Sequence, residues 1–263
     1  METINNLKAA VCQFDVKPGA VEANIVLALA AIRRASDQGA GLLILPELWS
    51  CGFDIRQMAA CAEQTPGILD RIGGIAAEKN VMIAGSLPER SGDAVFNTLF
   101  VIDRTGKMAG FYRKIHLFSL MDEDRCFSRG DKPVICRTGD ADFGMMICYD
   151  LRFPELCRRL AVNGARMVIV SAQWPAVRID HWDILLRARA IENQIFVIAT
   201  NACGAAGTEF NGHSQIISPT GEILAHAGEA QGEALALIDF TEIENFRNRF
   251  STIAERVPDA YEP

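Results

Sequence analysis

The amino-acid sequence predicts an α/β fold in which two mixed sheets pack face to face and carry helices on their outer faces. Short apolar runs, which are typical of buried strands, alternate with segments whose apolar residues recur at helical spacing. The order strand, helix, strand and hairpin occurs once in each half of the chain. Since a sheet covered by helices on one face must bury its other face, we expect the two sheets to pack against each other.

The first half begins with an apolar run over 7–14, expected to be a strand, and continues with a helix that ends near Gly39. Pro18 and Gly19 separate these two elements. The helix has one apolar face, which is formed by Val21, Ile25, Leu29 and Ile32. The remaining elements of this half are predicted as a strand at 41–47, a helix at 68–79, a strand at 81–86 and two hairpin arms at 95–103 and 107–114.

The second half repeats that order. A strand at 143–147 leads to a helix at 154–165, which Pro154 can open because its missing N–H costs nothing at the first helical position. The remaining elements are predicted as a strand at 167–171, a helix at 181–194, a strand at 195–201 and a hairpin at 213–227. Both hairpins turn at Thr-Gly, which is consistent with a pseudo-repeat, although Thr-Gly turns are also common outside repeats.

Length and composition indicate one domain over residues 1–263. The chain is 49% hydrophobic and no linker or low-complexity segment divides it. Its net charge of −7 argues against nucleic acid or an anionic membrane surface as a partner. The N-terminus lacks the features of a signal peptide, and no apolar run is long enough to cross a bilayer. We therefore expect a cytoplasmic protein.

The cysteines and histidines predict neither disulfides nor a metal site, and no cofactor is expected. No CxxC pair occurs among the eight cysteines, so free thiols are expected. No two of the four histidines lie at i, i+4 with a carboxylate between them. The histidines are His116, His181, His213 and His226.

Three polar residues stand where apolar strands end: Glu47, Lys114 and Cys148. Each alone is a weak indication, because a cysteine after a buried strand is more often structural. Together they complete a mechanism of acyl transfer through a thioester. Glu47 could accept the thiol proton while Cys148 attacks a carbonyl carbon. Lys114 and the backbone N–H groups after Cys148 could stabilise the oxyanion that forms.

These residues resemble the catalytic Glu-Lys-Cys set of the nitrilase, or carbon–nitrogen hydrolase, superfamily. The resemblance is carried by the segments LLILPELWSCGFD, YRKIHLF and GMMICYDLRFPEL, and it extends from about residue 9 to about residue 240. It implies a four-layer α-β-β-α sandwich. It also implies paired subunits that form an eight-layer dimer or a larger even-numbered assembly.

The same resemblance implies further site residues. Glu123 matches a second glutamate of the family, and a solvated acidic loop is the alternative. Tyr149 is expected to offer its backbone N–H to the oxyanion. Trp174 matches a position that lines the substrate pocket, with packing in a loop as the alternative. Arg152 could bind a substrate carboxylate, or it could pair with an acidic side chain such as Glu155.

Within the family, the segments CYDLRFPEL and WPAVRIDHWDILLRARAIENQ most resemble the omega-amidase group. That group hydrolyses the terminal amide of small 2-oxo dicarboxylic acid monoamides, so the expected partner is a small amide substrate. Nitrilases and N-carbamoyl amidohydrolases share the scaffold and remain alternatives. This sequence departs from many relatives at Ala202-Cys203, where they carry Asn-Arg. The loop that contains these residues is expected at the pocket or at a subunit interface.

Two alternatives lie outside this family chemistry. A papain-like thiol hydrolase would need a histidine beside Cys148, and His116 is expected to make a structural hydrogen bond instead. The second alternative is a binding protein with an inactive site. The presence of all three residue types of the Glu-Lys-Cys set argues against it. The apolar stripe of the helix at 181–194 could face the core or a partner subunit, and it includes Trp182, Leu185 and Leu186.

Overall fold

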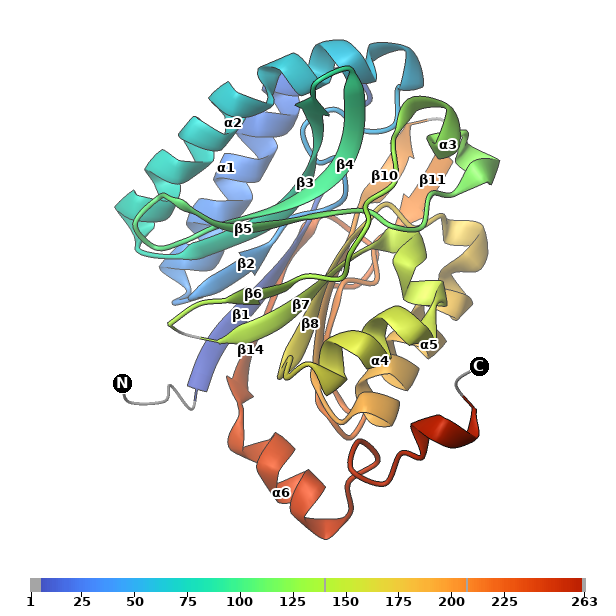
Figure 1. Ribbon diagram of the computed structural model, residues 1–263. Coiled ribbons are helices and arrows are strands. Elements are labelled where there is room, and N and C mark those ends of the chain that lie inside the picture. Colours follow the sequence, from blue (N-terminus) through green and yellow to red (C-terminus); the bar gives the residue numbers. More distant parts are fainter. Residues whose placement is uncertain (1–5, 140, 207, 262–263) are drawn as a thin grey trace.

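The computed structural model, which describes residues 6–139, 141–206 and 208–261, contains two six-stranded sheets that pack between layers of helices (Figure 1). The first sheet has the spatial order β14 (Gly232–Asp239), β1 (Asn6–Gln13), β2 (Leu42–Ile44), β3 (Met82–Ser91), β4 (Ala94–Ile102), β5 (Met108–Arg113). The second has the order β13 (Ile223–His226), β12 (Gln215–Ile217), β9 (Phe196–Asn201), β8 (Met167–Ala172), β7 (Asp142–Ile147), β6 (Ile135–Arg137). The predicted sandwich is confirmed.

The two sheets have the same connectivity, which supports the pseudo-repeat. In each sheet three consecutive strands are parallel neighbours, β1-β2-β3 in the first and β7-β8-β9 in the second. A hairpin then continues the sheet in antiparallel fashion, β4–β5 or β12–β13. One further antiparallel strand completes the other edge, β14 or β6. The two Thr-Gly hairpins therefore occupy equivalent places.

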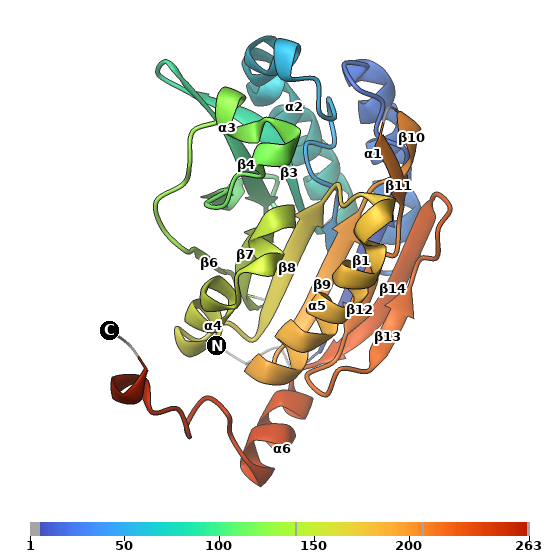
Figure 2. The same cartoon turned by 90° about the vertical axis from the view of Figure 1, so that its right-hand side faces the viewer.

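Helices cover the outer face of each sheet (Figures 1 and 2). The first sheet carries α1 (Val21–Asp37) and α2 (Met58–Lys79), and the second carries α4 (Pro154–Val162) and α5 (Ile179–Asn193). On α5, Trp182 and Leu186 are fully buried in the core, so this stripe faces the sheet rather than a partner. The remaining elements are α3 (Glu123–Cys126), α6 (Thr241–Arg249), the hairpin strands β10 (Cys203–Ala206) and β11 (Thr208–Asn211), and 3-10 turns at Ile55–Gln57, Ser119–Met121, Cys148–Arg152, Ala176–Arg178 and Pro258–Ala260.

Helix α2 begins at Met58, not at residue 68 as the sequence pattern predicts. Pro66 lies inside the helix, where proline normally removes a hydrogen bond and ends the pattern. Tertiary contacts outweigh that cost, because Cys61 and Thr65 on the earlier turns are buried. The Thr65 hydroxyl also donates a 2.5 Å hydrogen bond to the carbonyl of Pro88 at the edge of the sheet.

Hydrogen bonds between the sheets hold their central strands together at one end of the sandwich. The Ser171 hydroxyl donates to the carbonyl of Leu45 at 2.8 Å, and the Thr200 hydroxyl donates to the carbonyl of Ile44 at 2.9 Å. All four residues are buried, so these polar contacts fix the register of one sheet on the other. The carboxyl ends of β2, β7 and β8 therefore meet at this end of the sandwich.

Two other expectations can be compared with the structure. All eight cysteines are free thiols, as predicted. Among the described residues, no helix is both long and apolar enough to cross a membrane.

Candidate active site

Four polar side chains from separate loops meet in the interior, and we call them the polar cluster: Glu47, Lys114, Glu123 and Cys148. The Nζ atom of Lys114 lies 2.7 Å from Oε1 of Glu47 and 2.7 Å from Oε1 of Glu123. The side chains of Glu47 and Lys114 are fully buried, and that of Glu123 is 1% exposed. The alternative of a solvated acidic loop at Glu123 is therefore wrong. The structure brings together residues that are 67 and 9 positions apart.

Glu47 is fixed by donors that the sequence pattern did not single out. Its Oε1 accepts a 2.8 Å hydrogen bond from Asn97 Nδ2, and its Oε2 accepts a 3.0 Å bond from the backbone N–H of Gln173. The Gln173 side chain donates in turn to the Glu47 carbonyl at 2.7 Å. An amide inside the otherwise apolar strand β4 was the available indication for Asn97, because buried polar groups require partners.

Lys114 is an ammonium held between two carboxylates. Burial alone lowers the pKa of Lys114, but the charges of Glu123 and Glu47 outweigh it and raise that pKa above its ordinary value. Burial raises the pKa of Glu123, with Lys114 opposing and Glu47 adding to the shift. The backbone N–H of Phe118 donates to Glu123 Oε2 at 3.1 Å. The carboxylates of Glu47 and Glu123 thus share the single positive charge of Lys114. One of the two carboxylates can therefore hold a proton.

Cys148 occupies a sharp turn immediately after β7. Its φ of +45° lies in the left-handed region, which is uncommon for a residue with a side chain. A strained turn at a strand end is typical of nucleophiles that are held out from the backbone toward a pocket. Burial raises the pKa of Cys148, Glu47 raises it further and Lys114 lowers it. The resting group is therefore a thiol, whose Sγ donates a 3.8 Å hydrogen bond to the carbonyl of Gln173, and the nearby Glu47 carboxylate is the candidate base for it.

The buried carboxylate of Asp150 supports this turn, and the sequence pattern did not identify it. Its Oδ2 accepts hydrogen bonds from the backbone N–H of Ile147 at 2.9 Å and from the Tyr112 hydroxyl at 2.8 Å. Its Oδ1 accepts from the backbone N–H of His116 at 3.1 Å and lies 2.8 Å from the His116 ring Nδ1. Asp150 is fully buried, so these contacts compensate its desolvation.

This arrangement joins the segment of Lys114 to the turn of Cys148. Tyr112 and His116 each lie two residues from Lys114, and both bond to the carboxylate two residues after Cys148. The His116 ring also stacks on Phe153, with ring centroids 3.6 Å apart. The predicted structural role of His116 is confirmed. Its ring engages Asp150 and Phe153, so it does not act as the thiol partner that a papain-like hydrolase would need.

A narrow pocket with a cavity volume of only about 10 Å³ opens above the Cys148 thiol. We call it the thiol pocket, and its walls include Phe118, Met121, Tyr149, Arg152, Trp174 and Arg178. The guanidinium of Arg152 lies 4.6 Å from the Trp174 ring centroid, and its nitrogens lie 3.3 Å from His181 Nδ1. Within the described ranges, neither Arg152 nor Arg178 forms an ion pair with a carboxylate. The expected alternative, an acidic partner for Arg152, is wrong.

Trp174 combines the two roles that the sequence left open. Its backbone N–H donates to Asn201 Oδ1 at 2.6 Å and its ring Nε1 donates to the Arg178 carbonyl at 2.8 Å, so loop packing fixes it. Its ring also lines the thiol pocket. Ala202 and Cys203 are buried and lie outside the pocket wall, where the Cys203 N–H donates to the carbonyl of Phe14.

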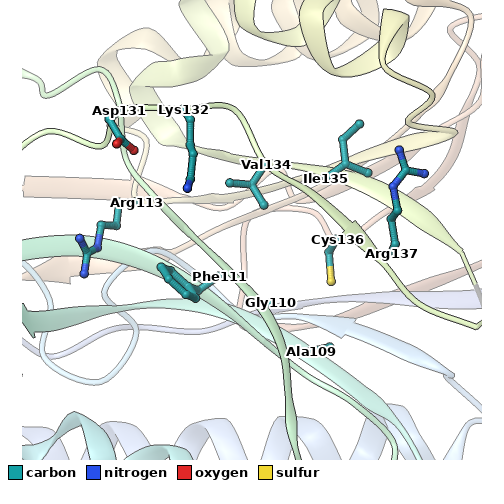
Figure 3. Close-up of a pocket in the computed structure, with 10 residues that line it drawn as sticks. All are labelled: Ala109, Gly110, Phe111, Arg113, Asp131, Lys132, Val134, Ile135, Cys136 and Arg137. Atoms are coloured by element: carbon teal, nitrogen blue, oxygen red, sulfur yellow. The ribbon is translucent and has the colours of Figure 1, made fainter.

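A larger hollow of about 440 Å³ lies elsewhere, between β5 and β6 (Figure 3). Its cationic side chains include Arg113, which pairs with Glu89, and Arg137, which pairs with Asp142. None of the polar cluster lines it. Size alone therefore does not single out the candidate site, because Cys148 of the polar cluster lines the smaller pocket.

Comparison with known proteins agrees with this geometry. Residues 8–248 match the family model described as carbon-nitrogen hydrolase. This chain belongs to the carbon–nitrogen hydrolase family. It is 38% identical over 252 residues to a 2-oxoglutaramate amidase of Bacillus subtilis (strain 168), covering 95% of this chain and 97% of the relative. It is 30% identical over 254 residues to a human omega-amidase, covering 90% and 91% of the two chains.

A solved structure of a family member is also similar. The amidase of Nesterenkonia sp. AN1, in a form with the acetamide moiety of fluoroacetamide added covalently at its active-site cysteine, superposes with a TM-score of 0.84. The sequences are 29% identical, and the match covers 94% of this chain and 98% of that chain. The carbon–nitrogen hydrolase described here therefore has the fold that its sequence predicts. Within the family it resembles the omega-amidase group.

Proposed function

We propose that this hydrolase cleaves the terminal carboxamide of a short dicarboxylic acid monoamide and releases ammonia, with Glu47, Lys114 and Cys148 as its catalytic residues. The observation that carries the substrate class is the pair Arg152 and Arg178. Both guanidinium groups line the pocket above the thiol without a carboxylate partner among the described residues. A carboxylate at the far end of the substrate would supply that partner, in a bidentate contact.

The reaction begins with acylation. Glu47 accepts the Sγ proton while Sγ bonds to the amide carbon, and the carbonyl electrons move to oxygen. Lys114 Nζ and the backbone N–H of Tyr149 stabilise that oxyanion. When the carbonyl re-forms, the C–N bond breaks and Glu47 returns the proton to the leaving nitrogen. Ammonia departs and a thioester remains on Cys148.

Deacylation reverses the roles, with water in place of the thiol. Glu47 takes a proton from water while the water oxygen bonds to the thioester carbon, and the C–S bond then breaks. The sulfur regains a proton and the product leaves as a carboxylic acid. Glu123 contacts the Lys114 ammonium throughout the reaction. We therefore assign Glu123 the role of holding Lys114 in place and favouring its charged form.

The size and walls of the thiol pocket favour a short substrate. The pocket is narrow, which disfavours a large substrate, and the aromatic rings of Phe118, Tyr149 and Trp174 would pack against the methylene groups of a short one. Similarity to 2-oxoglutaramate amidase and omega-amidase supports the same class. A nitrile or an N-carbamoyl amino acid could use the same cysteine, and these are the competing substrates.

A substrate panel tests the proposal. Ammonia release is measured with succinamate and glutaramate, with their methyl esters, with the matching nitriles and with N-carbamoyl-β-alanine. We expect the free acids to have the highest kcat/KM and their esters a much higher KM. Faster turnover of neutral amides, nitriles or the carbamoyl compound would overturn the substrate class. It would leave the Glu47-Lys114-Cys148 assignment standing.

We further propose that residues 1–263 form one domain, that the protein works in the cytoplasm, and that it assembles as a homodimer or a larger even-numbered oligomer. Val177 and Ile184, near the start of α5, are 81% and 65% exposed. Val177 lies in the 3-10 turn before α5 and Ile184 lies on α5, and neighbouring exposed apolar side chains can be covered by an interface in an assembly. A twofold contact through this face would cover them.

A further inference from the structure

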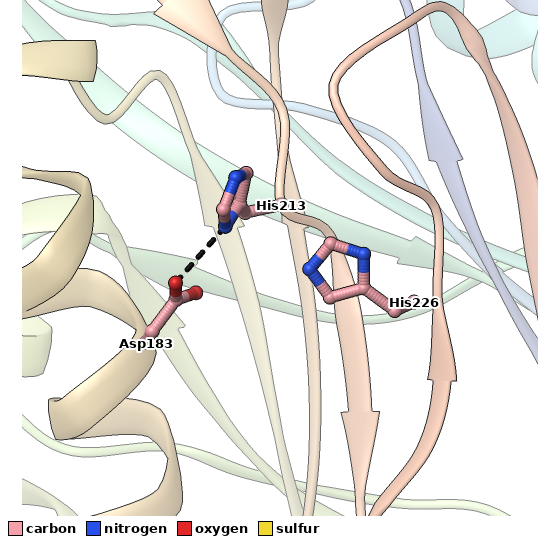
Figure 4. A group of neighbouring side chains, drawn as sticks. All are labelled: Asp183, His213 and His226. Atoms are coloured by element: carbon pink, nitrogen blue, oxygen red, sulfur yellow. Dashed lines mark hydrogen bonds and ion pairs between the residues drawn. The ribbon is translucent and has the colours of Figure 1, made fainter.

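A second group of ligand-type side chains lies outside the thiol pocket, where three elements meet. Asp183 comes from α5, His213 precedes β12 and His226 ends β13 (Figure 4). One ligand atom from each residue lies within 4.8 Å of the other two. His213 Nδ1 is 2.9 Å from Asp183 Oδ2, and the two imidazole rings meet edge to face with centroids 5.0 Å apart.

We propose that Asp183, His213 and His226 bind a divalent transition-metal ion of the Zn²⁺ type. Two imidazoles and one carboxylate are a donor set that suits Zn²⁺, Co²⁺ or Ni²⁺, whereas Mg²⁺ and Ca²⁺ prefer oxygen ligands alone. The spacing of these residues along the chain follows no metal-binding motif, which is why the sequence predicted no site. The site depends entirely on how α5 packs against the second sheet.

Neighbouring groups already orient two of the three ligands. The Gln215 side chain donates to Asp183 Oδ1, which leaves Oδ2 directed at the histidines. His213 Nε2 lies 3.8 Å from Glu229 Oε1, beyond hydrogen-bond distance, and a closer approach of that carboxylate would hold the proton on Nε2 while Nδ1 binds a metal beside Asp183. Histidine ligands commonly have such a carboxylate on their other nitrogen.

The backbone around His213 is fixed as well. Its N–H donates to the carbonyl of Gly228 at 2.9 Å, and its own carbonyl accepts a 2.8 Å bond from Trp182 Nε1. Its φ of +60° lies in the left-handed region and needs such support. The chain therefore holds the His213 ring between Asp183 and His226.

His226 is the ligand that must adjust. Tetrahedral ligands at zinc distances lie about 3.4 Å apart, so the widest pair must close by a rotation of side chains. His226 is exposed, and its Nδ1 accepts a 2.8 Å bond from the Gly228 N–H. Metal binding at Nδ1 would exchange that hydrogen bond for a metal bond at the same unprotonated nitrogen, so no proton has to leave it.

An ion at this site would join α5 to the β12–β13 hairpin. Trp182, next to Asp183, packs on Trp174 of the thiol pocket with ring centroids 5.5 Å apart. The metal would thus act as a structural clamp behind one wall of the pocket, with no part in the reaction. Because the folded chain alone presents this site, the metal should raise the thermal midpoint, by an amount that grows with the logarithm of its concentration over Kd.

The test uses the full chain after treatment with a chelator and dialysis. It is titrated with Co²⁺ by absorption spectroscopy and with Zn²⁺ by calorimetry, alongside His226→Ala, Asp183→Asn and the control His181→Ala. We expect one equivalent to bind to the wild type and to His181→Ala. Loss of a ligand should weaken binding at least about tenfold. Since His226 is exposed, its variant should fold normally without metal.

Two results would overturn the proposal. One is wild-type binding that His226→Ala leaves unchanged in stoichiometry and affinity. The other is no saturable binding at all in the micromolar range. A strong thiolate-to-cobalt charge-transfer band would assign the ion to cysteines instead. The thermal midpoint supplies an independent measurement, because Zn²⁺ should raise it in the wild type and in His181→Ala but not in His226→Ala.

Discussion

The hydroxyl of Tyr112 donates a 2.8 Å hydrogen bond to Oδ2 of Asp150, and both groups are fully buried. This contact connects the strand that carries Lys114 to the turn that carries Cys148. The base, the cation and the thiol therefore do not rely on their own contacts alone for alignment. A supporting carboxylate, shared between two segments of chain, fixes their relative positions.

We first predict that Tyr112→Phe lowers both stability and turnover. Removing one buried hydrogen bond should cost about 1 kcal/mol of unfolding free energy, measured by urea denaturation. Asp150→Asn should cost more, because an amide N–H₂ must then face donors at Ile147 and His116. For a positioning role, kcat should fall more than KM rises. Loss of stability with unchanged kcat would leave Asp150 as a structural residue only.

Cys148→Ala should abolish ammonia release while the fold remains intact by circular dichroism. A substoichiometric alkylating agent should modify Cys148 before the other seven cysteines, because Glu47 can accept its proton and the thiol pocket gives the reagent access. The modified residue is identified by peptide mass spectrometry. Preferential labelling elsewhere, with activity retained, would exclude Cys148 as the nucleophile.

The variants Glu47→Gln and Lys114→Arg test separately the proposed base and the positive charge beside the thiol. The glutamine keeps the size of Glu47 but cannot accept the thiol proton, so acylation should slow by a factor of about 10²–10⁴. Arginine keeps the charge of Lys114, but its planar fork cannot fit between two carboxylates that lie 2.7 Å from Nζ. Near-normal single-turnover rates in Lys114→Arg would mean that only diffuse positive charge is required.

The pH dependence of alkylation should respond to Glu47 in a defined direction. Burial and the Glu47 charge raise the pKa of Cys148, and Lys114 lowers it. Glu47→Gln removes a charge that raises the pKa of Cys148 and keeps the Lys114 charge, which lowers that pKa. The midpoint of the labelling rate against pH should therefore move to lower pH in Glu47→Gln than in the wild type. A shift to higher pH would contradict this account of the electrostatics.

Arg152→Ala should remove most of the preference for a free carboxylate. Losing one charged hydrogen-bonded contact should cost about 2–3 kcal/mol, or roughly thirty- to two-hundred-fold in kcat/KM for the acid substrate. The methyl ester should be affected far less. Arg178→Ala reports whether the second guanidinium shares the role, and the exposed Arg159→Ala on α4 serves as the control. An unchanged acid-to-ester ratio in both pocket variants would exclude the arginine anchor.

Sedimentation equilibrium checks the proposed assembly. We expect a dimer or a larger even-numbered species at micromolar concentration, which Ile184→Glu should weaken by placing a charge in the covered face. An active monomer in the wild type would contradict the assembly.

The sequence by itself determined the layers and the residues that are proposed to react. Strand ends are recognisable from apolar runs, and Glu47, Lys114 and Cys148 each follow one, so their residue types sufficed to suggest thioester chemistry. The sequence pattern failed at α2, where Pro66 indicated a break. Local propensity is a weak guide wherever buried neighbours such as Thr65 decide the outcome.

Only the tertiary structure decided which polar residues support the site. Asn97 and Gln173 lie 50 and 126 positions from Glu47, and Asp150 contacts Tyr112 from 38 positions away. The contacts of Gln173 and Asp150 depend on how one sheet packs on the other. The same holds for Asp183, His213 and His226, whose spacing matches no motif. Periodicity reports which face of an element is buried, whereas distances between side chains from different elements are set by packing. The local pattern therefore predicted the fold and the reacting atoms, but not their supporting contacts.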